Sequence, residues 1–69
     1  MKACVKVKGI DVPCYVTGMK KIIAKKNGGA VSEIRDFEGV CFGSGCYYVF
    51  VGEQILHIWG HSIEFVSFQ

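Results

Sequence analysis

The chain has 69 residues, of which 51% are apolar and 20% are charged, with nine glycines and one proline. This length suits one small domain covering residues 1–69 and excludes a two-domain enzyme or a typical nucleotide-binding α/β fold. The apolar content argues against disorder, and no apolar run approaches the roughly 20 residues that a membrane-spanning helix needs. No secretory signal is visible after Met1, so we expect a cytoplasmic protein that does not associate with membranes.

The net charge of +2 hides an asymmetry along the chain. Residues 1–30 contain seven lysines and one acid, whereas residues 31–69 contain one arginine and five acids. Such a separation can steer a charged partner or favour self-association, unless the two groups interleave in the fold and cancel.

Two strands are expected near the start of the chain. Apolar and lysine side chains alternate over residues 2–8, which predicts a half-buried strand with a lysine-lined outer face that also carries Cys4. The alternation of residues 11–17 predicts a second strand. Pro13 cannot donate a ladder hydrogen bond, so this strand belongs at an edge or a bulge.

Residues 18–26 fit two structures. Thr17 can cap a helix with Ile22 and Ile23 in its apolar stripe, and Asn27-Gly28-Gly29 would end that helix. The Asn-Gly pair is also a strong hairpin signal, and two adjacent β-branched residues favour a strand. We favour the short helix, which would make the protein α+β, and retain the hairpin strand as the alternative.

The last third of the chain contains the clearest strands. Residues 46–51, 54–59 and 62–68 predict a three-strand antiparallel meander. Both faces of these strands are apolar, although an antiparallel sheet in a soluble monomer normally keeps one face polar. Because little chain is left to cover a second face, we expect a homo-oligomer or a surface for a protein partner. Its aromatic anchors would be Tyr47, Tyr48, Phe50, Trp59, Phe65 and Phe68.

Strands of this number and length, with a long excursion after the second one, predict a mainly β protein: a small antiparallel SH3-like open barrel with a C-terminal three-strand meander. By analogy with compact proteins of this kind, we expect a small non-enzymatic adaptor or inhibitor-type protein that self-associates and binds through an exposed apolar sheet face or edge. No catalytic residue or cofactor is expected. A nucleophilic pair such as Cys46 with His57 would need a third orienting group and a cleft.

Two cysteines and two histidines have a spacing that can complete a tetrahedral zinc site, Cys41-x4-Cys46-x10-His57-x3-His61. The segment resembles the C2H2 zinc finger in this ligand spacing. It departs from the finger because His57 directly follows Leu56 and because residues 55–61 alternate like a strand. A zinc-stabilised module is therefore an alternative to four free, mostly buried thiols.

Single-stranded nucleic-acid binding is the main alternative function. Small barrels bind single strands through basic grooves with aromatic stacking platforms, and Tyr15 shares the outward side of the second strand. The sequence pI of about 8.4 is lower than is typical of dedicated nucleic-acid-binding domains. The side chains that would follow the phosphates are Lys2, Lys6, Lys8, Lys20, Lys21, Lys25 and Lys26.

Overall fold

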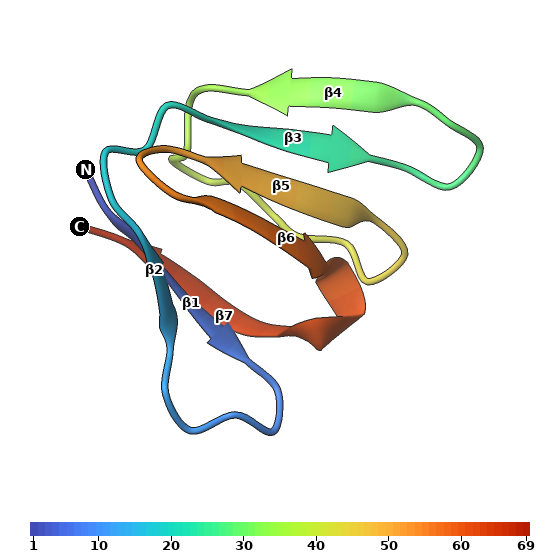
Figure 1. Ribbon diagram of the computed structural model, residues 1–69. Coiled ribbons are helices and arrows are strands. Elements are labelled where there is room, and N and C mark those ends of the chain that lie inside the picture. Colours follow the sequence, from blue (N-terminus) through green and yellow to red (C-terminus); the bar gives the residue numbers. More distant parts are fainter.

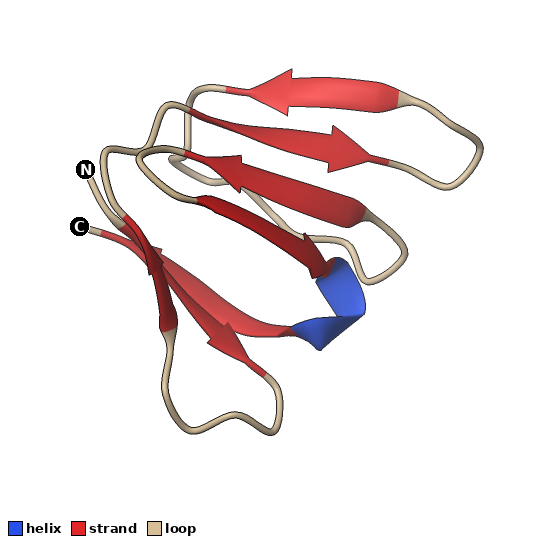
Figure 2. Cartoon of the chain, viewed as in Figure 1, coloured by secondary structure: helices blue, strands red, loops and turns tan.

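A computed structural model describes all 69 residues, which form seven antiparallel strands and one short 3-10 helix (Figures 1 and 2). One sheet has the strand order β2-β1-β7 and the other has the order β4-β3-β5-β6. The mainly β prediction is confirmed. The elements are β1 (Ala3–Val7), β2 (Cys14–Val16), β3 (Lys21–Lys25), β4 (Val31–Ile34), β5 (Tyr47–Val51), β6 (Ile55–Trp59), η1 (Gly60–Ser62) and β7 (Ile63–Phe68).

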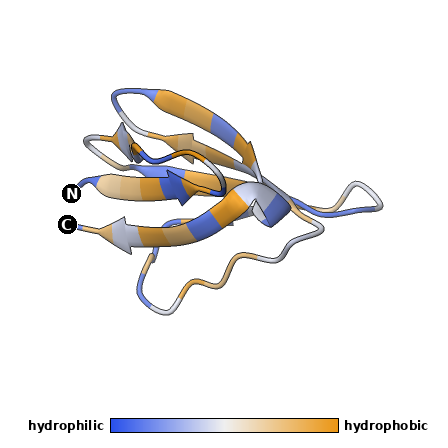
Figure 3. Cartoon of the chain, turned by 90° about the horizontal axis from the view of Figure 1, so that it is seen from below, coloured by the Kyte–Doolittle hydropathy of each residue, from blue (hydrophilic) through white to orange (hydrophobic).

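The core lies between the two sheets, because each sheet turns one set of alternating side chains toward the other. Ala3, Val5 and Val16 of the three-stranded sheet are buried together with Ile22 and Phe50 of the four-stranded sheet. Apolar and polar residues alternate along several of the strands (Figure 3). Two sheets that share one core in this way must point their other faces in opposite directions.

A long segment, residues 35–46, connects β4 to β5 without regular structure and covers an open side of the core (Figure 1). Its Phe37 ring stacks on Phe68 with the centroids 5.0 Å apart. Its Phe42 ring packs edge-on against Tyr48 at 4.9 Å. The segment therefore supplies aromatic side chains that the strands lack at this side of the core.

The helix predicted for residues 18–26 is wrong, and the hairpin alternative is right. β3 pairs with β4 on one side and with β5 on the other, and its inward residues Ile22 and Ala24 are buried. The turn between β3 and β4 has Gly28 and Gly29 at φ values of +98° and +91°, which glycine adopts without strain. If residues 18–26 formed a helix, the backbone N–H and C=O groups on the edge of β5 that faces β3 would have no partner strand.

The three strands of the predicted C-terminal meander exist, but the third pairs elsewhere. β5 and β6 form a hairpin, whereas β7 pairs with β1 at the centre of the other sheet. The turn of η1 redirects the chain from one sheet to the other. The Gly60 N–H donates to the Cys46 carbonyl oxygen over 2.7 Å, which holds this turn against the start of β5.

Two further expectations have mixed outcomes. The strand that follows Pro13 lies at the edge of its sheet, as predicted. Neither sheet closes on itself, so the fold is described as two antiparallel sheets around one core, and an SH3-like barrel is not confirmed. The only helical element is the three-residue η1, and no helix is long and apolar enough to cross a membrane.

The close approach of Gly60 to the Gly43 backbone predicts a large effect of a single methyl group. A Cβ at Gly60 would overlap the Gly43 carbonyl oxygen and lie 3.1 Å from the Tyr48 ring. Gly60→Ala should therefore lower the free energy of unfolding by about 1–3 kcal/mol or more, measured by urea denaturation. Gly45→Ala is the matched control, because a Cβ there meets nothing within 4 Å. Equal stability of the two variants would contradict the predicted contact.

Candidate binding faces on the two sheets

The outer face of the four-stranded sheet carries a row of rings. Tyr47 and Trp59 are direct cross-strand partners on β5 and β6, and their ring centroids lie 4.9 Å apart at an interplanar angle of 70°. His57 lies 5.9 Å from Tyr47, and His61 stacks on Trp59 at 5.9 Å. Trp59 is nevertheless 51% exposed. Much of the indole surface is therefore open to a ligand.

A shallow hollow of about 390 Å³ opens beside these rings, at the end of β3. We call it the lysine–aromatic hollow. The Lys25 and Lys26 ammonium groups form no ion pair, unlike Lys21 and Arg35, which both contact the Glu33 carboxylate. The hollow thus joins two free cations to an aromatic pair whose Trp59 is exposed and whose Tyr47 is half-buried. Its lining residues are Lys25, Lys26, Asn27, Gly29, Gly45, Tyr47 and Trp59.

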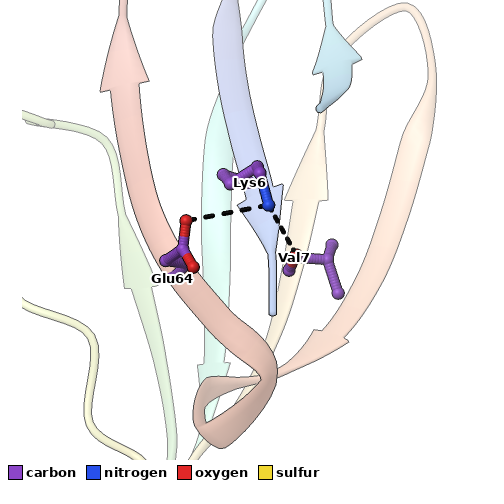
Figure 4. A network of polar contacts seen from close by, with 3 residues as sticks. All are labelled: Lys6, Val7 and Glu64. Carbon is purple, nitrogen blue, oxygen red and sulfur yellow. Dashed lines mark hydrogen bonds and ion pairs between the residues drawn. The ribbon is translucent and has the colours of Figure 1, made fainter. Parts of the chain in front are cut away.

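The outer face of the three-stranded sheet, on the opposite side of the molecule, also carries both lysines and aromatic rings. The Lys2 ammonium lies over the Tyr15 ring, 5.0 Å from its centroid. Tyr15 is 50% exposed and Phe65 is 51% exposed. The Lys6 ammonium lies 3.7 Å from the Glu64 carboxylate and donates to the Val7 carbonyl oxygen over 3.2 Å (Figure 4).

Cys4 was expected to face solvent from this side, and that expectation is wrong. Its side chain does lie opposite Tyr15 on the outer face, but only 7% of the residue is exposed, because it sits in the central strand of the sheet. A hydrogen bond with the Cys4 thiol raises the pKa of the Tyr15 phenol.

The six aromatic residues predicted as interface anchors do not form one surface. Tyr48 and Phe50 are buried in the core, so their assignment to an interface is wrong. Phe68 is half-buried and stacks on Phe37. Tyr47 and Trp59 lie on the outer face of one sheet, and Phe65 on the outer face of the other.

The seven lysines predicted to bind nucleic acid are divided in the same way. Lys2 and Lys6 belong to the three-stranded sheet, and Lys8 lies in the turn after β1. Lys20 and Lys21 stand at the start of β3, and Lys25 and Lys26 at its end. Two of the seven pair with acids from the second half of the chain, Lys6 with Glu64 and Lys21 with Glu33, so the two halves partly neutralise each other.

The four residues of the zinc hypothesis are not brought together. No three His, Cys, Asp or Glu side chains are grouped so that they could hold a metal ion. The reason is local: β6 is a strand, so His57 points outward beside Tyr47, while His61 follows in η1 and stacks on Trp59. Cys41 lies in the connecting segment near the Gly39 carbonyl, and all four cysteines are free.

A larger hollow of about 600 Å³ lies beside the two chain ends. Two cationic and two acidic side chains face it, so its charge does not favour a ligand of either sign. Its lining residues are Met1, Met19, Lys20, Arg35, Asp36, Phe37, Glu38 and Phe68. The lysine–aromatic hollow has no acidic lining residue and is therefore the more selective of the two.

Sequence reasoning missed the contribution of the turns to the hollow. Asn27 and Gly29 come from the β3–β4 turn, and Gly45 comes from the loop before β5. The Asn-Gly-Gly sequence next to a lysine pair was the available signal. It indicates a hairpin tip with little side-chain bulk, which leaves neighbouring rings uncovered.

Burial of Tyr48 has a consequence at alkaline pH. Burial raises the pKa of the Tyr48 phenol, and the Cys46 thiol adds to this increase, while a bond from the Gly43 N–H opposes it. An unfolded tyrosine ionises near pH 10, so stability should fall as the pH rises above about 10 toward the pKa of the folded state. Tyr48→Phe should lose less stability than the wild type between pH 9 and about 11. Parallel pH profiles from chemical denaturation would contradict this.

The outer faces are the features from which function must be inferred. Each combines exposed rings with lysines, and neither contains a group of metal ligands. Comparison of the chain with models of protein families, with curated proteins and with solved structures finds no match. No family is therefore assigned to the chain.

Proposed function

We propose that the protein is a non-enzymatic binding protein whose ligand is single-stranded nucleic acid, held at the lysine–aromatic hollow. The observation that carries this proposal is the exposed Trp59, packed against a half-buried Tyr47, beside two lysines without ion-pair partners. Proteins that bind single strands combine these two elements, because bases stack on aromatic side chains and phosphates attract ammonium groups.

The form of the hollow favours an unpaired strand over a duplex. Trp59 presents its exposed surface on a sheet, where a base can reach it only after leaving its own stack. A volume of about 390 Å³ lies within the usual range of ligand pockets, roughly 300–1,000 Å³. The side chains that line the hollow supply two ammonium groups, one amide and two aromatic rings. These groups can bind a ligand through charge, hydrogen bonds and stacking.

The finer description of the fold belongs to the same proposal. Two antiparallel sheets around one core, crossed by a long connecting segment, support an SH3-like open barrel. A cytoplasmic location, in which the four thiols would stay reduced, is likewise part of the proposal. Small open barrels often use a sheet face together with adjacent loops to bind a strand.

Self-association through the same face is a second candidate. Val31 and Ile55 are large, exposed apolar residues on the two edge strands of the four-stranded sheet; Val31 is the cross-strand partner of Lys25 beside the hollow, and neither residue lines it. A second copy of the chain would cover both. Sedimentation velocity over a range of protein concentrations, with and without oligonucleotide, separates the two candidates. If oligonucleotide binds only the monomer, self-association and nucleic-acid binding compete for the same face.

Removal of the indole tests the stacking contact. Trp59→Ala should weaken binding of a short oligothymidine about 5- to 150-fold, because stacking of one base is worth about 1–3 kcal/mol. Ile55→Ala is the matched control, since Ile55 is exposed on the same strand but does not line the hollow. Fluorescence anisotropy measures both affinities. An equal effect of the two substitutions, or none, would contradict the proposal.

Removal of the lysines tests the phosphate contacts. The Lys25→Gln/Lys26→Gln double variant should reduce the slope of log K against log salt concentration by about 0.7 for each lysine that contacts a phosphate. Lys8→Gln/Lys20→Gln removes the same charge at two exposed lysines outside the hollow. Titrations at several salt concentrations give the slopes. Identical slopes for the two double variants would place the contact outside the hollow.

A further inference from the structure

The outer face of the three-stranded sheet repeats the chemistry of the hollow on the opposite side of the protein. It carries two exposed rings and two lysines, of which Lys6 is largely buried, and we call it the tyrosine face: Lys2, Lys6, Tyr15 and Phe65. We propose that the tyrosine face is a second site for single-stranded nucleic acid, so that one protein molecule holds two strands at once. This inference rests on the proposed function and adds a bridging activity to it.

The register of the sheet separates the two rings. Tyr15 lies opposite Cys4, and Phe65 lies opposite Lys6, so the rings stand on the outer strands β2 and β7 with β1 between them. Two inter-strand spacings and the two-residue offset along β1 place the Cα atoms of Tyr15 and Phe65 about 12 Å apart. The surface between the rings is low, because Cys4 is nearly buried and its other neighbour is Ser67. Phe65 can therefore stack on one base, and Tyr15 can stack on another once the Lys2 ammonium moves from its ring to a phosphate.

The charges of this face suit phosphate groups. Lys2 lies over Tyr15, where its ammonium can contact the backbone of a strand whose base stacks nearby. The Lys6 ammonium lies 3.7 Å from the Glu64 carboxylate in the free protein (Figure 4), where 52% of the Glu64 side chain but only 19% of the Lys6 side chain is exposed. The exposed Glu64 carboxylate is free to move, so a phosphate that takes its place can contact Lys6.

The shared core sets the distance between the two sites. Both sheets turn their inner residues toward each other, and packed sheets lie about 10 Å apart. Strands bound outside the two sheets are therefore further apart than the Debye length of about 8 Å at physiological salt and would repel each other only weakly. Strands on the two outer faces also cannot collide, because the protein lies between them.

The stoichiometry of short oligonucleotides tests the second site. Isothermal titration with a short oligothymidine should give two strands per wild-type molecule. The Tyr15→Ala/Phe65→Ala variant should bind one, with the affinity of the remaining site unchanged, and Trp59→Ala should weaken the other one. Energy transfer between two differently labelled, non-complementary oligonucleotides should appear with the wild type and disappear with Tyr15→Ala/Phe65→Ala.

A gain of affinity provides a test that loss of folding cannot imitate. Glu64→Gln frees Lys6 and removes a negative charge from the tyrosine face, so binding there should tighten about two- to fivefold. Glu38→Gln removes the same charge from an exposed residue in the connecting segment and should change nothing. Tightening by both variants alike would indicate a general charge effect and overturn the assignment of the second site to this face.

The remaining outcomes separate this inference from the proposed function. One strand per wild-type molecule, lost with Trp59→Ala, would overturn the second site and leave the hollow in place. Energy transfer that survives Tyr15→Ala/Phe65→Ala, in a protein that sediments as a dimer, would assign bridging to paired hollows and also overturn the inference. If the wild type binds no oligonucleotide at low salt, both the second site and the proposed function are overturned.

Discussion

The structure depends on the burial of two sheet faces against each other. A chain of 69 residues has enough apolar side chains for one such layer, and Phe50, Ile22, Val5 and Val16 are its largest fully buried members. Everything else follows from that layer. Apolar residues beyond it, including Trp59, Ile55 and Phe65, must stand on the surface, and they stand on two faces that look away from each other.

The positions of most strands were predictable from local alternation, but their partners were not. Lysine alternation identified β1, and the aromatic and aliphatic run before Gly52 identified β5. The pairing of β7 with β1 joins the two ends of the chain, and no local pattern encodes it. Residues 18–26 satisfied both helix and strand rules, and the neighbouring strands β4 and β5 decided between them.

The candidate site was predictable only in part, for a related reason. Both faces of β5 are apolar, so the sequence could not say whether Tyr47 or Tyr48 points inward. The connecting segment decides this: Phe42 packs against Tyr48 and Phe50, which commits them to the core and leaves Tyr47 outside with Trp59. The lysine pair beside these rings was named from sequence, whereas its proximity to Trp59 required the tertiary pairing of β3, β5 and β6.

The pairing of the first long strand with the last also governs how the chain can fold. β1 contacts β7 along most of its length, and the backbone groups of Lys2 and Gln69 exchange two hydrogen bonds at the ends. β1 obtains its second neighbour only when the distant end of the chain arrives. Contacts of such long sequence separation slow folding, since the loop must close before they contribute. The four-stranded sheet, by contrast, pairs strands from the middle of the sequence and needs neither β1 nor β7 for its ladders.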